Sequence, residues 1–162
     1  MSVLQCGRFR LDLSQPRVMA IINLTDDSFS GDGLRGDLAR ALARAERALE
    51  EGAEMLDIGA ESTRPGSDPV PEAQELERVV RFVEAARGWK VPLSIDTLKP
   101  TVMRAALAAG ADMINDINAF RASGAIEAVA AGESGLCVMH MLGQPRTMQQ
   151  DPRYADVVGE VT

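Results

Sequence analysis

The sequence has 162 residues, of which 46% are hydrophobic and 25% are charged, so it has enough apolar material for one globular domain and is not a disordered chain. Its formal net charge of −7 excludes a basic footprint, so we expect no nucleic-acid partner. No apolar run reaches the roughly 18 residues of a membrane span and the amino terminus lacks the apolar stretch of a signal peptide, so we expect no membrane partner and a cytoplasmic location.

The elements predicted in chain order alternate between short aliphatic strands and amphipathic helices. Residues 4–13 alternate around Gly7, which predicts an amino-terminal hairpin that would close the bottom of a barrel. Strands are then predicted at residues 18–23, 55–59, 92–96, 113–116 and 136–140. Helices with one apolar face are predicted at residues 37–51, 72–87 and 99–109, and a further helical stripe begins at residue 154. This alternation is typical of the α/β class.

A repeated unit of helix, glycine and strand agrees with this prediction. Residues 48–57 resemble residues 106–115, and in both segments the glycine separates the end of a helix from the start of a strand. A single echo is a weak repeat signal, because many junctions of helix and strand have this form.

Polar residues stand at or near the end of each predicted strand. They are Asn23, Asp57, Asp96, Asn115 with Asp116, and His140. In parallel sheets and barrels the carboxyl ends of the strands meet on one side, where ligands bind. One polar residue can simply terminate its strand, but a polar residue at every strand end predicts a shared ligand site.

The loops after the first two strands are rich in charge and hydroxyl groups. Residues 24–33 carry several aspartates, several hydroxyl side chains and Phe29, which suits a lid over a planar ligand. Residues 59–67 place Thr63 beside Arg64, and hydroxyl and guanidinium donors together suit phosphate or diphosphate oxygens. The alternative is that both loops are ordinary solvated turns, for which this composition is common.

The motifs at these strand ends and loops resemble, in order and spacing, those of the dihydropteroate synthase family. They read NLTDDSFS at residues 23–30, DIGAESTRPG at 57–66, SIDT at 94–97, INDI at 114–117 and MHM at 139–141. The resemblance extends along essentially the whole chain. It implies a single pterin-binding (β/α)₈ TIM barrel, of which residues 1–162 would supply the amino-terminal hairpin and about the first five βα units, with strands 6 to 8 absent.

The resemblance also implies an activity. Members of the family are transferases of folate biosynthesis that condense (7,8-dihydropterin-6-yl)methyl diphosphate with 4-aminobenzoate, giving 7,8-dihydropteroate and diphosphate through dissociative loss of diphosphate. Because the last strands and their site residues are absent, we expect the 162-residue chain alone to be inactive. The resemblance also implies that the full-length protein forms a homodimer. The alternatives are a non-catalytic pterin-binding paralogue or regulatory module, and a related barrel that transfers methyl groups from methyltetrahydrofolate.

Four strand-end residues are implied to bind the pterin, namely Asp57, Asp96, Asn115 and Met139. Asp96 is also implied to be catalytic. A carboxylate accepts hydrogen bonds from the amino-pyrimidine edge of a pterin, and an amide beside it serves a neighbouring donor and acceptor.

Three further residues are implied to serve the leaving group. Thr63 and Arg64 would bind the diphosphate, and Asn23 would hold Mg²⁺, the implied cofactor. The charge of the metal would then neutralise the diphosphate as it departs.

The first loop is implied to act on the reacting carbon and on 4-aminobenzoate. Asp27 would be catalytic, because its negative charge stabilises positive charge on the pterin methylene as the C–O bond breaks. Phe29 and Pro65 would enclose the ring of 4-aminobenzoate. The family motif has proline where this chain has Asp26, and the extra carboxylate would alter closure of the loop or affinity for the metal.

Overall fold

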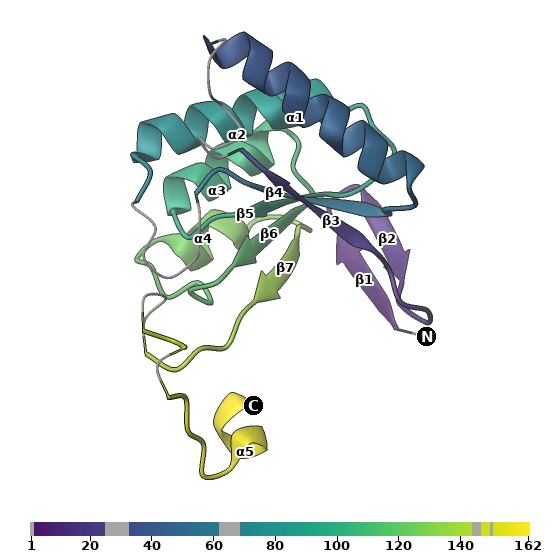
Figure 1. Ribbon diagram of the computed structural model, residues 1–162. Helices are drawn as coiled ribbons and strands as arrows, with labels where there is room; N and C mark the ends of the chain where they lie inside the picture. Colours follow the sequence, from purple (N-terminus) through teal and green to yellow (C-terminus); the bar gives the residue numbers. More distant parts are fainter. Residues whose placement is uncertain (1, 25–32, 62–68, 144–146, 150) are drawn as a thin grey trace.

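The computed structural model describes residues 2–24, 33–61, 69–143, 147–149 and 151–162. A five-stranded parallel sheet forms its centre, helices cover one face of the sheet, and a two-stranded hairpin lies beside it (Figure 1). Within the described ranges, no helix is both long enough and apolar enough to cross a membrane.

The connections between the parallel strands all advance in the same direction across the sheet. The antiparallel hairpin consists of β1 (Val3–Cys6) and β2 (Phe9–Asp12), and the parallel strands are β3 (Met19–Asn23), β4 (Met55–Gly59), β5 (Leu93–Asp96), β6 (Met113–Asp116) and β7 (Gly135–Val138). Each parallel strand pairs with the next one along the chain, in the order β3-β4-β5-β6-β7. Right-handed crossovers that all advance the same way place the helices that connect the strands on one face, as in a (β/α)₈ barrel and unlike a doubly wound sheet. The predicted fold class is therefore confirmed, including the amino-terminal hairpin.

The helices are α1 (Gly33–Glu50), α2 (Glu72–Ala86), α3 (Pro100–Ala109), α4 (Ala125–Val129) and α5 (Val157–Val161). The first three pack on the sheet through the apolar faces that their sequences predict, whereas α5 has no buried residue. Leu42 of α1 packs against the main core, and Val79 and Val83 of α2 are buried in it. α3 ends at Gly110, whose φ of 115° is the left-handed conformation expected of a helix cap. α4 was not predicted, because its five residues are too few to show a helical period.

The main core lies between the sheet and the helices. β4 is buried along its whole length, and its Leu56 and Ile58 join Ile95, Ile114 and Phe82 in this core. Successive side chains of a strand point to opposite faces of the sheet. The residues that alternate with these apolar side chains therefore point away from the helices.

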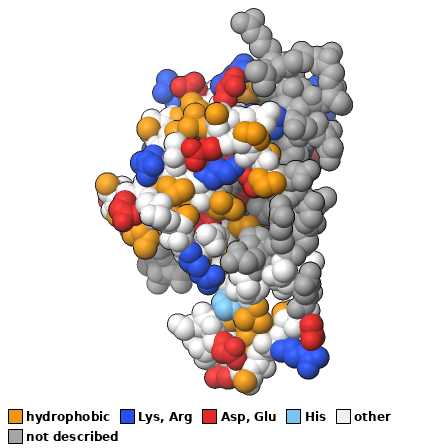
Figure 2. All heavy atoms as spheres, turned by 90° about the vertical axis from the view of Figure 1, so that its left-hand side faces the viewer, with side chains coloured by type: hydrophobic (Ala, Val, Ile, Leu, Met, Phe, Trp, Pro, Cys, Tyr) orange, Lys and Arg blue, Asp and Glu red, His pale blue; other side chains and the backbone are white. Residues whose placement is uncertain are grey.

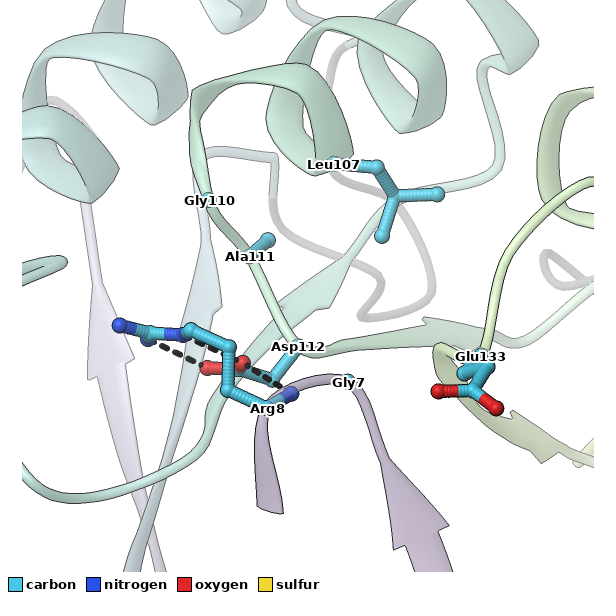
Figure 3. A pocket seen from close by; sticks show the side chains of 7 residues that line it. All are labelled: Gly7, Arg8, Leu107, Gly110, Ala111, Asp112 and Glu133. Carbon is cyan, nitrogen blue, oxygen red and sulfur yellow. Dashed lines mark hydrogen bonds and ion pairs between the residues drawn. The ribbon is translucent and has the colours of Figure 1, made fainter.

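An ion pair anchors the hairpin to the start of β6. Asp112 is fully buried, and its carboxylate accepts hydrogen bonds from Arg8 Nε (2.9 Å), Arg8 Nη2 (2.8 Å) and the backbone N–H of Arg8 (3.2 Å) (Figure 3). The same carboxylate accepts a hydrogen bond from the backbone N–H of Leu93 at 3.1 Å. At Gly7, where φ is 54°, an added Cβ would lie 2.8 Å from the Asp112 Cα. Glycine is therefore needed for the hairpin to approach this closely.

A second small core lies under the same end of the sheet. Cys6 of β1 is buried with Met55 of β4 and Met113 of β6. Burial and the nearby charge of Asp112 raise the pKa of the Cys6 thiol to about 11. The thiol stays protonated at neutral pH, so Cys6 packs as a small apolar side chain. The hairpin thus covers the amino-terminal ends of the parallel strands.

The end of the last strand differs from the prediction. β7 ends at Val138, which is paired with Asp116, the last residue of β6. His140 therefore lies beyond the sheet and is exposed, although the sequence suggested that it ends a strand. Its ring lies against that of Tyr154, with 5.7 Å between the ring centroids.

The two edge strands expose apolar side chains. Ile21 of β3 is 66% exposed and Val138 of β7 is 60% exposed. On the face of the molecule shown in Figure 2, by contrast, hydrophobic side chains are scattered among acidic and basic ones. The apolar surface at the edges of the sheet is therefore available for packing against further structure.

Candidate functional site

The parallel register aligns the last residues of neighbouring strands. Asn23 is paired with Gly59, Gly59 with Asp96, Asp96 with Asn115, and Asn115 with Cys137. The row therefore carries amide, carboxylate and thiol groups at the carboxyl ends of five adjacent strands. An added Cβ at Gly59 would be in contact with the Asp96 carboxylate at 3.6 Å, so glycine here leaves space beside that group. Three of the predicted site residues thus lie in one row.

Asp57 lies one layer below this row and holds Asn115 in place. Its side chain is buried, Oδ1 accepts a hydrogen bond from Ser94 Oγ at 2.6 Å, and Oδ2 accepts one from Asn115 Nδ2 at 3.0 Å. An ionised carboxylate can only accept, so this contact orients the Asn115 amide. Within the described part of the chain, no hydrogen bond occupies the Asn115 carbonyl oxygen or its second amide hydrogen. Sequence reasoning missed Ser94, whose role depends on its register with Asp57.

Asp96 is the electrostatic centre of the site. Its Oδ1 is buried and has no hydrogen-bond partner among the described residues. Burial, as the largest cause, and repulsion from neighbouring acids together raise the pKa of this carboxyl to about 7, with Asp57 and Glu75 contributing more of the repulsion than Asp116 and Glu61. A buried acceptor without a partner is costly unless a ligand supplies the donor. Asp96 is therefore the residue of this site that most needs a ligand.

Asp116 and Met139 lie at the carboxyl ends of the last two strands, β6 and β7. Asp116 is buried and accepts hydrogen bonds from the backbone N–H groups of Asn118 and Phe120, both at 2.7 Å, so it caps the turn after β6. Met139 is half-buried just after β7, and its N–H donates to the Asp116 carbonyl at 3.3 Å. This backbone hydrogen bond holds Met139 beside the strand row, and its role in binding the pterin stays a prediction.

Five predicted site residues lie outside the described residues. They are Asp27, Phe29, Thr63, Arg64 and Pro65. Leu24, the last described residue before the first of these loops, donates its N–H to the Gly59 carbonyl at 2.7 Å and accepts a hydrogen bond from Arg78 Nη1 at 3.3 Å.

The predicted metal ligand Asn23 is exposed at the end of β3. Within the described part of the chain, no three His, Cys, Asp or Glu side chains are grouped so that they could hold a metal. An exposed amide oxygen nevertheless fits Mg²⁺, because this ion usually keeps several waters and is completed by phosphate oxygens of the substrate.

A charged cluster that sequence reasoning missed lies beside Asp96. Lys99 Nζ contacts both Glu61 and Glu75 at 2.5 Å, and Glu75 also accepts a hydrogen bond from Thr97. Glu61, Glu75, Asp96 and Thr97 line one small cavity. In the sequence this cluster is indicated only by the positions of Glu61 and Lys99, which follow the ends of two adjacent strands.

The fold and this row define a class of protein. A parallel sheet wound in one direction, with amides and a carboxylate at the carboxyl ends of its strands, is typical of α/β barrels that bind small ligands at that end. The family described as pterin binding enzyme matches residues 19–162, and the chain belongs to that family. The resemblance found in the motifs is thereby confirmed.

Three similar proteins illustrate the relationship. The dihydropteroate synthase of Neisseria meningitidis serogroup B is 49% identical over 98% of this chain and 57% of its own length. A crystal structure of Burkholderia cenocepacia dihydropteroate synthase complexed with 7,8-dihydropteroate is 60% identical, with a TM-score of 0.85, over 99% of this chain and 54% of that one. The structure of Xanthomonas albilineans dihydropteroate synthase with 4-aminobenzoic acid is 48% identical, with a TM-score of 0.83, over 98% of this chain and 56% of that one. The chain thus spans little more than half the length of these relatives.

Proposed function

We propose that this chain is the amino-terminal part of a dihydropteroate synthase. The complete protein would condense (7,8-dihydropterin-6-yl)methyl diphosphate with 4-aminobenzoate, releasing diphosphate and giving 7,8-dihydropteroate. The observation that carries the proposal is the buried Oδ1 of Asp96, which has no hydrogen-bond partner among the described residues and lies in the same row as Asn115. Support comes from the relative solved with 7,8-dihydropteroate and from the relative solved with 4-aminobenzoic acid.

The chemistry of a pterin suits this pair of residues. The amino group and a ring N–H on one edge of a pterin are adjacent donors, and a carboxylate can accept both. Asn115, whose Nδ2 is fixed by Asp57 at 3.0 Å, offers its carbonyl oxygen and one hydrogen beside that edge. Asp57 has both oxygens engaged by protein donors, so in this proposal it serves the pterin chiefly by orienting Asn115.

The remaining roles follow from the matching motifs. Mg²⁺ held in part by Asn23 would supply positive charge to the diphosphate, which Thr63 and Arg64 would also bind. Asp27 would stabilise positive charge on the methylene carbon as the bond to diphosphate breaks. Phe29 and Pro65 would hold the aminobenzoate ring against that carbon.

The exposed sheet edges support completion of the barrel by further strands. Ile21 and Val138 lie on the two edge strands, β3 and β7, and three further strands would have to bridge these edges to close a (β/α)₈ barrel. We infer that residues 1–162 form the first part of one barrel domain, that they do not catalyse alone, and that the complete protein is a cytoplasmic homodimer.

Diphosphate release tests the proposal. The complete protein, mixed with the pterin diphosphate, 4-aminobenzoate and Mg²⁺, is expected to release diphosphate and form dihydropteroate in equal amounts. Omitting 4-aminobenzoate is the control, and it should abolish formation of dihydropteroate. If the protein binds a pterin but forms no product with both substrates, it is the non-catalytic pterin-binding alternative and the proposed activity is wrong.

Affinity for a pterin should depend on pH because of Asp96. Since the pKa of this carboxyl is raised to about 7, the free protein holds a proton there below pH 7 and must release it to accept the ligand's donors. Affinity should therefore rise with pH by up to about tenfold per unit below 7 and level off above it. Titration calorimetry in two buffers of different ionisation enthalpy should detect proton release at pH 6 but not at pH 8. After correction for titration of the ligand, a flat profile would contradict this assignment.

A further inference from the structure

The ammonium group of Lys99 is fixed by three acceptors just beyond the end of β5. Its Nζ donates to Glu61 Oε2 at 2.5 Å, to Glu75 Oε2 at 2.5 Å and to the Val70 carbonyl at 2.7 Å. An ammonium has three hydrogens, so these acceptors use all of its donors. The Lys99 side chain is only 16% exposed and that of Glu75 is 1% exposed. The positive charge of Lys99 is therefore held in one largely buried place.

The carboxylate of Asp96 lies beside the same two acids. Glu61, Glu75 and Asp96 line one small cavity together with Thr97. The Asp96 Oδ1 is buried and has no hydrogen-bond partner among the described residues, although Lys99 follows it by only three positions. Buried carboxylates are usually paired with a cation or a donor. Asp96 would therefore attract the ammonium if the ammonium were not already held.

Glu75 holds Lys99 by two routes. This residue lies in the first turn of α2, and its Oε2 accepts the hydrogen bond from the ammonium. Its Oε1 accepts a hydrogen bond from Thr97 Oγ1 at 2.5 Å, and the same Oγ1 accepts one from the backbone N–H of Lys99 at 3.2 Å. The side chain of Lys99 is thus tied to Glu75 directly, and its backbone is tied to Glu75 through Thr97.

The same hydrogen bonds keep Lys99 charged. Burial acts to lower the pKa of the ammonium, but the hydrogen bonds to Glu61 and Glu75 outweigh burial and raise this pKa above its usual value. A permanent cation that reached Asp96 would occupy its acceptor oxygens and neutralise its charge. The position of the ammonium therefore decides whether Asp96 can accept hydrogen bonds from a ligand.

We propose that Glu75 is a positioning residue of the pterin site, which holds the Lys99 ammonium away from Asp96 and so leaves the Asp96 carboxylate open to the donors of the pterin. The inference rests on the proposed function, because it takes Asp96 as the acceptor for the pterin. In this arrangement neither Glu75 nor Lys99 touches the pterin. They act on the residue that does.

The test is the Kd of 6-hydroxymethyl-7,8-dihydropterin, a pterin without diphosphate, measured by calorimetric titration of the complete protein at pH 8, where Asp96 is largely ionised. Glu75→Met removes both acceptor oxygens and leaves one hydrogen of the Lys99 ammonium without its acceptor. Asp96 should then accept this hydrogen, and the Kd should rise by at least about tenfold. Glu84→Met, on the exposed face of the same helix, is the matched control and should change the Kd by less than about twofold.

Combining Glu75→Met with Lys99→Met separates this role from a merely structural one. The double variant has no ammonium to compete for Asp96, and it loses one negative and one positive charge, so the net charge near Asp96 is unchanged. Its Kd should therefore return to within about threefold of the parent value. The hydrogen bond from Thr97 to Glu75 is lost in both the single and the double variant. A loss of affinity caused by a displaced Thr97 would not be reversed.

A milder substitution guards against misfolding of the single variant. Glu75→Gln keeps the shape of the side chain and one acceptor oxygen, so its loss of affinity should be smaller, and Lys99→Met should reverse that loss as well. Circular dichroism checks the fold of each variant, and an apolar pair in place of a buried ion pair is compatible with folding. Parent affinity in Glu75→Met, or a loss that Lys99→Met does not reverse, would overturn the proposal.

A crystal structure without ligand separates this inference from the proposed function. In Glu75→Met the Lys99 Nζ should lie within about 3.2 Å of an Asp96 carboxylate oxygen, whereas in Glu84→Met it should remain with Glu61, Val70 and Glu75. This measurement needs neither a pterin nor turnover. If the parent protein binds no pterin, the proposed function fails, and the position of Nζ still decides whether Glu75 holds it away from Asp96. An Nζ that does not reach Asp96 in Glu75→Met would show that Glu75 has no such role.

Discussion

Asp96→Asn is expected to weaken binding of a pterin by roughly 10- to 100-fold while leaving the folded protein as stable as before, or more so. Loss of hydrogen bonds to a charged acceptor costs about 1.5–3 kcal/mol of binding free energy. The folded state, however, gains from the change. Burial and the repulsion of Asp57, Glu75, Asp116 and Glu61 all disfavour the ionised carboxylate, and an amide of the same shape avoids both.

The separation of affinity from stability makes this test specific. Calorimetric titration gives the pterin Kd and urea denaturation gives the free energy of unfolding, both at pH 8, where Asp96 is ionised in the parent protein. Glu84→Gln, on the exposed face of α2, is the matched control and should change neither quantity. The Asp96→Asn variant should also abolish the rise of pterin affinity with pH. An Asp96→Asn protein that keeps the parent affinity would remove Asp96 from the pterin site.

The direction and order of the elements could be predicted because strand and helix periods are local properties of the sequence. The aliphatic runs from Met55 and Met113 and the glycine cap at Gly110 need no tertiary information to be recognised. The polar strand ends could be predicted to meet for the same reason, because parallel strands bring their carboxyl ends together. Asp96 and Asn115 are paired in register as this expectation requires.

The partners of these residues could not be predicted, because they depend on which face each helix presents. The pattern of α2 predicts an apolar stripe, yet the helix also buries Glu75 and Arg78, two residues that a binary pattern assigns to solvent. Glu75 is buried because Lys99 and Thr97 satisfy its carboxylate. Long-range hydrogen bonds of this kind leave no periodic mark in a sequence.

The same limit applies at the other end of the sheet, where Asp112→Ala is expected to destabilise the fold by about 3–5 kcal/mol. In the sequence Asp112 is one acidic residue between a helix and a strand. In the structure its fully buried carboxylate receives three hydrogen bonds from Arg8 and one from the Leu93 N–H. Its removal leaves the Leu93 N–H buried without this acceptor and removes the ion pair between the hairpin and the start of β6.

The exposed pair of Arg17 and Glu54 provides the matched comparison. Arg17→Ala also removes an ion pair near the hairpin, but both side chains are substantially exposed, so the expected loss is below about 1 kcal/mol. Urea denaturation of the parent and the two variants measures the difference. If Asp112→Ala costs no more than Arg17→Ala, then the packing of Cys6 against Met55 and Met113 holds the hairpin by itself. A large difference would show that the ion pair, more than this small core, closes the amino-terminal end of the strands.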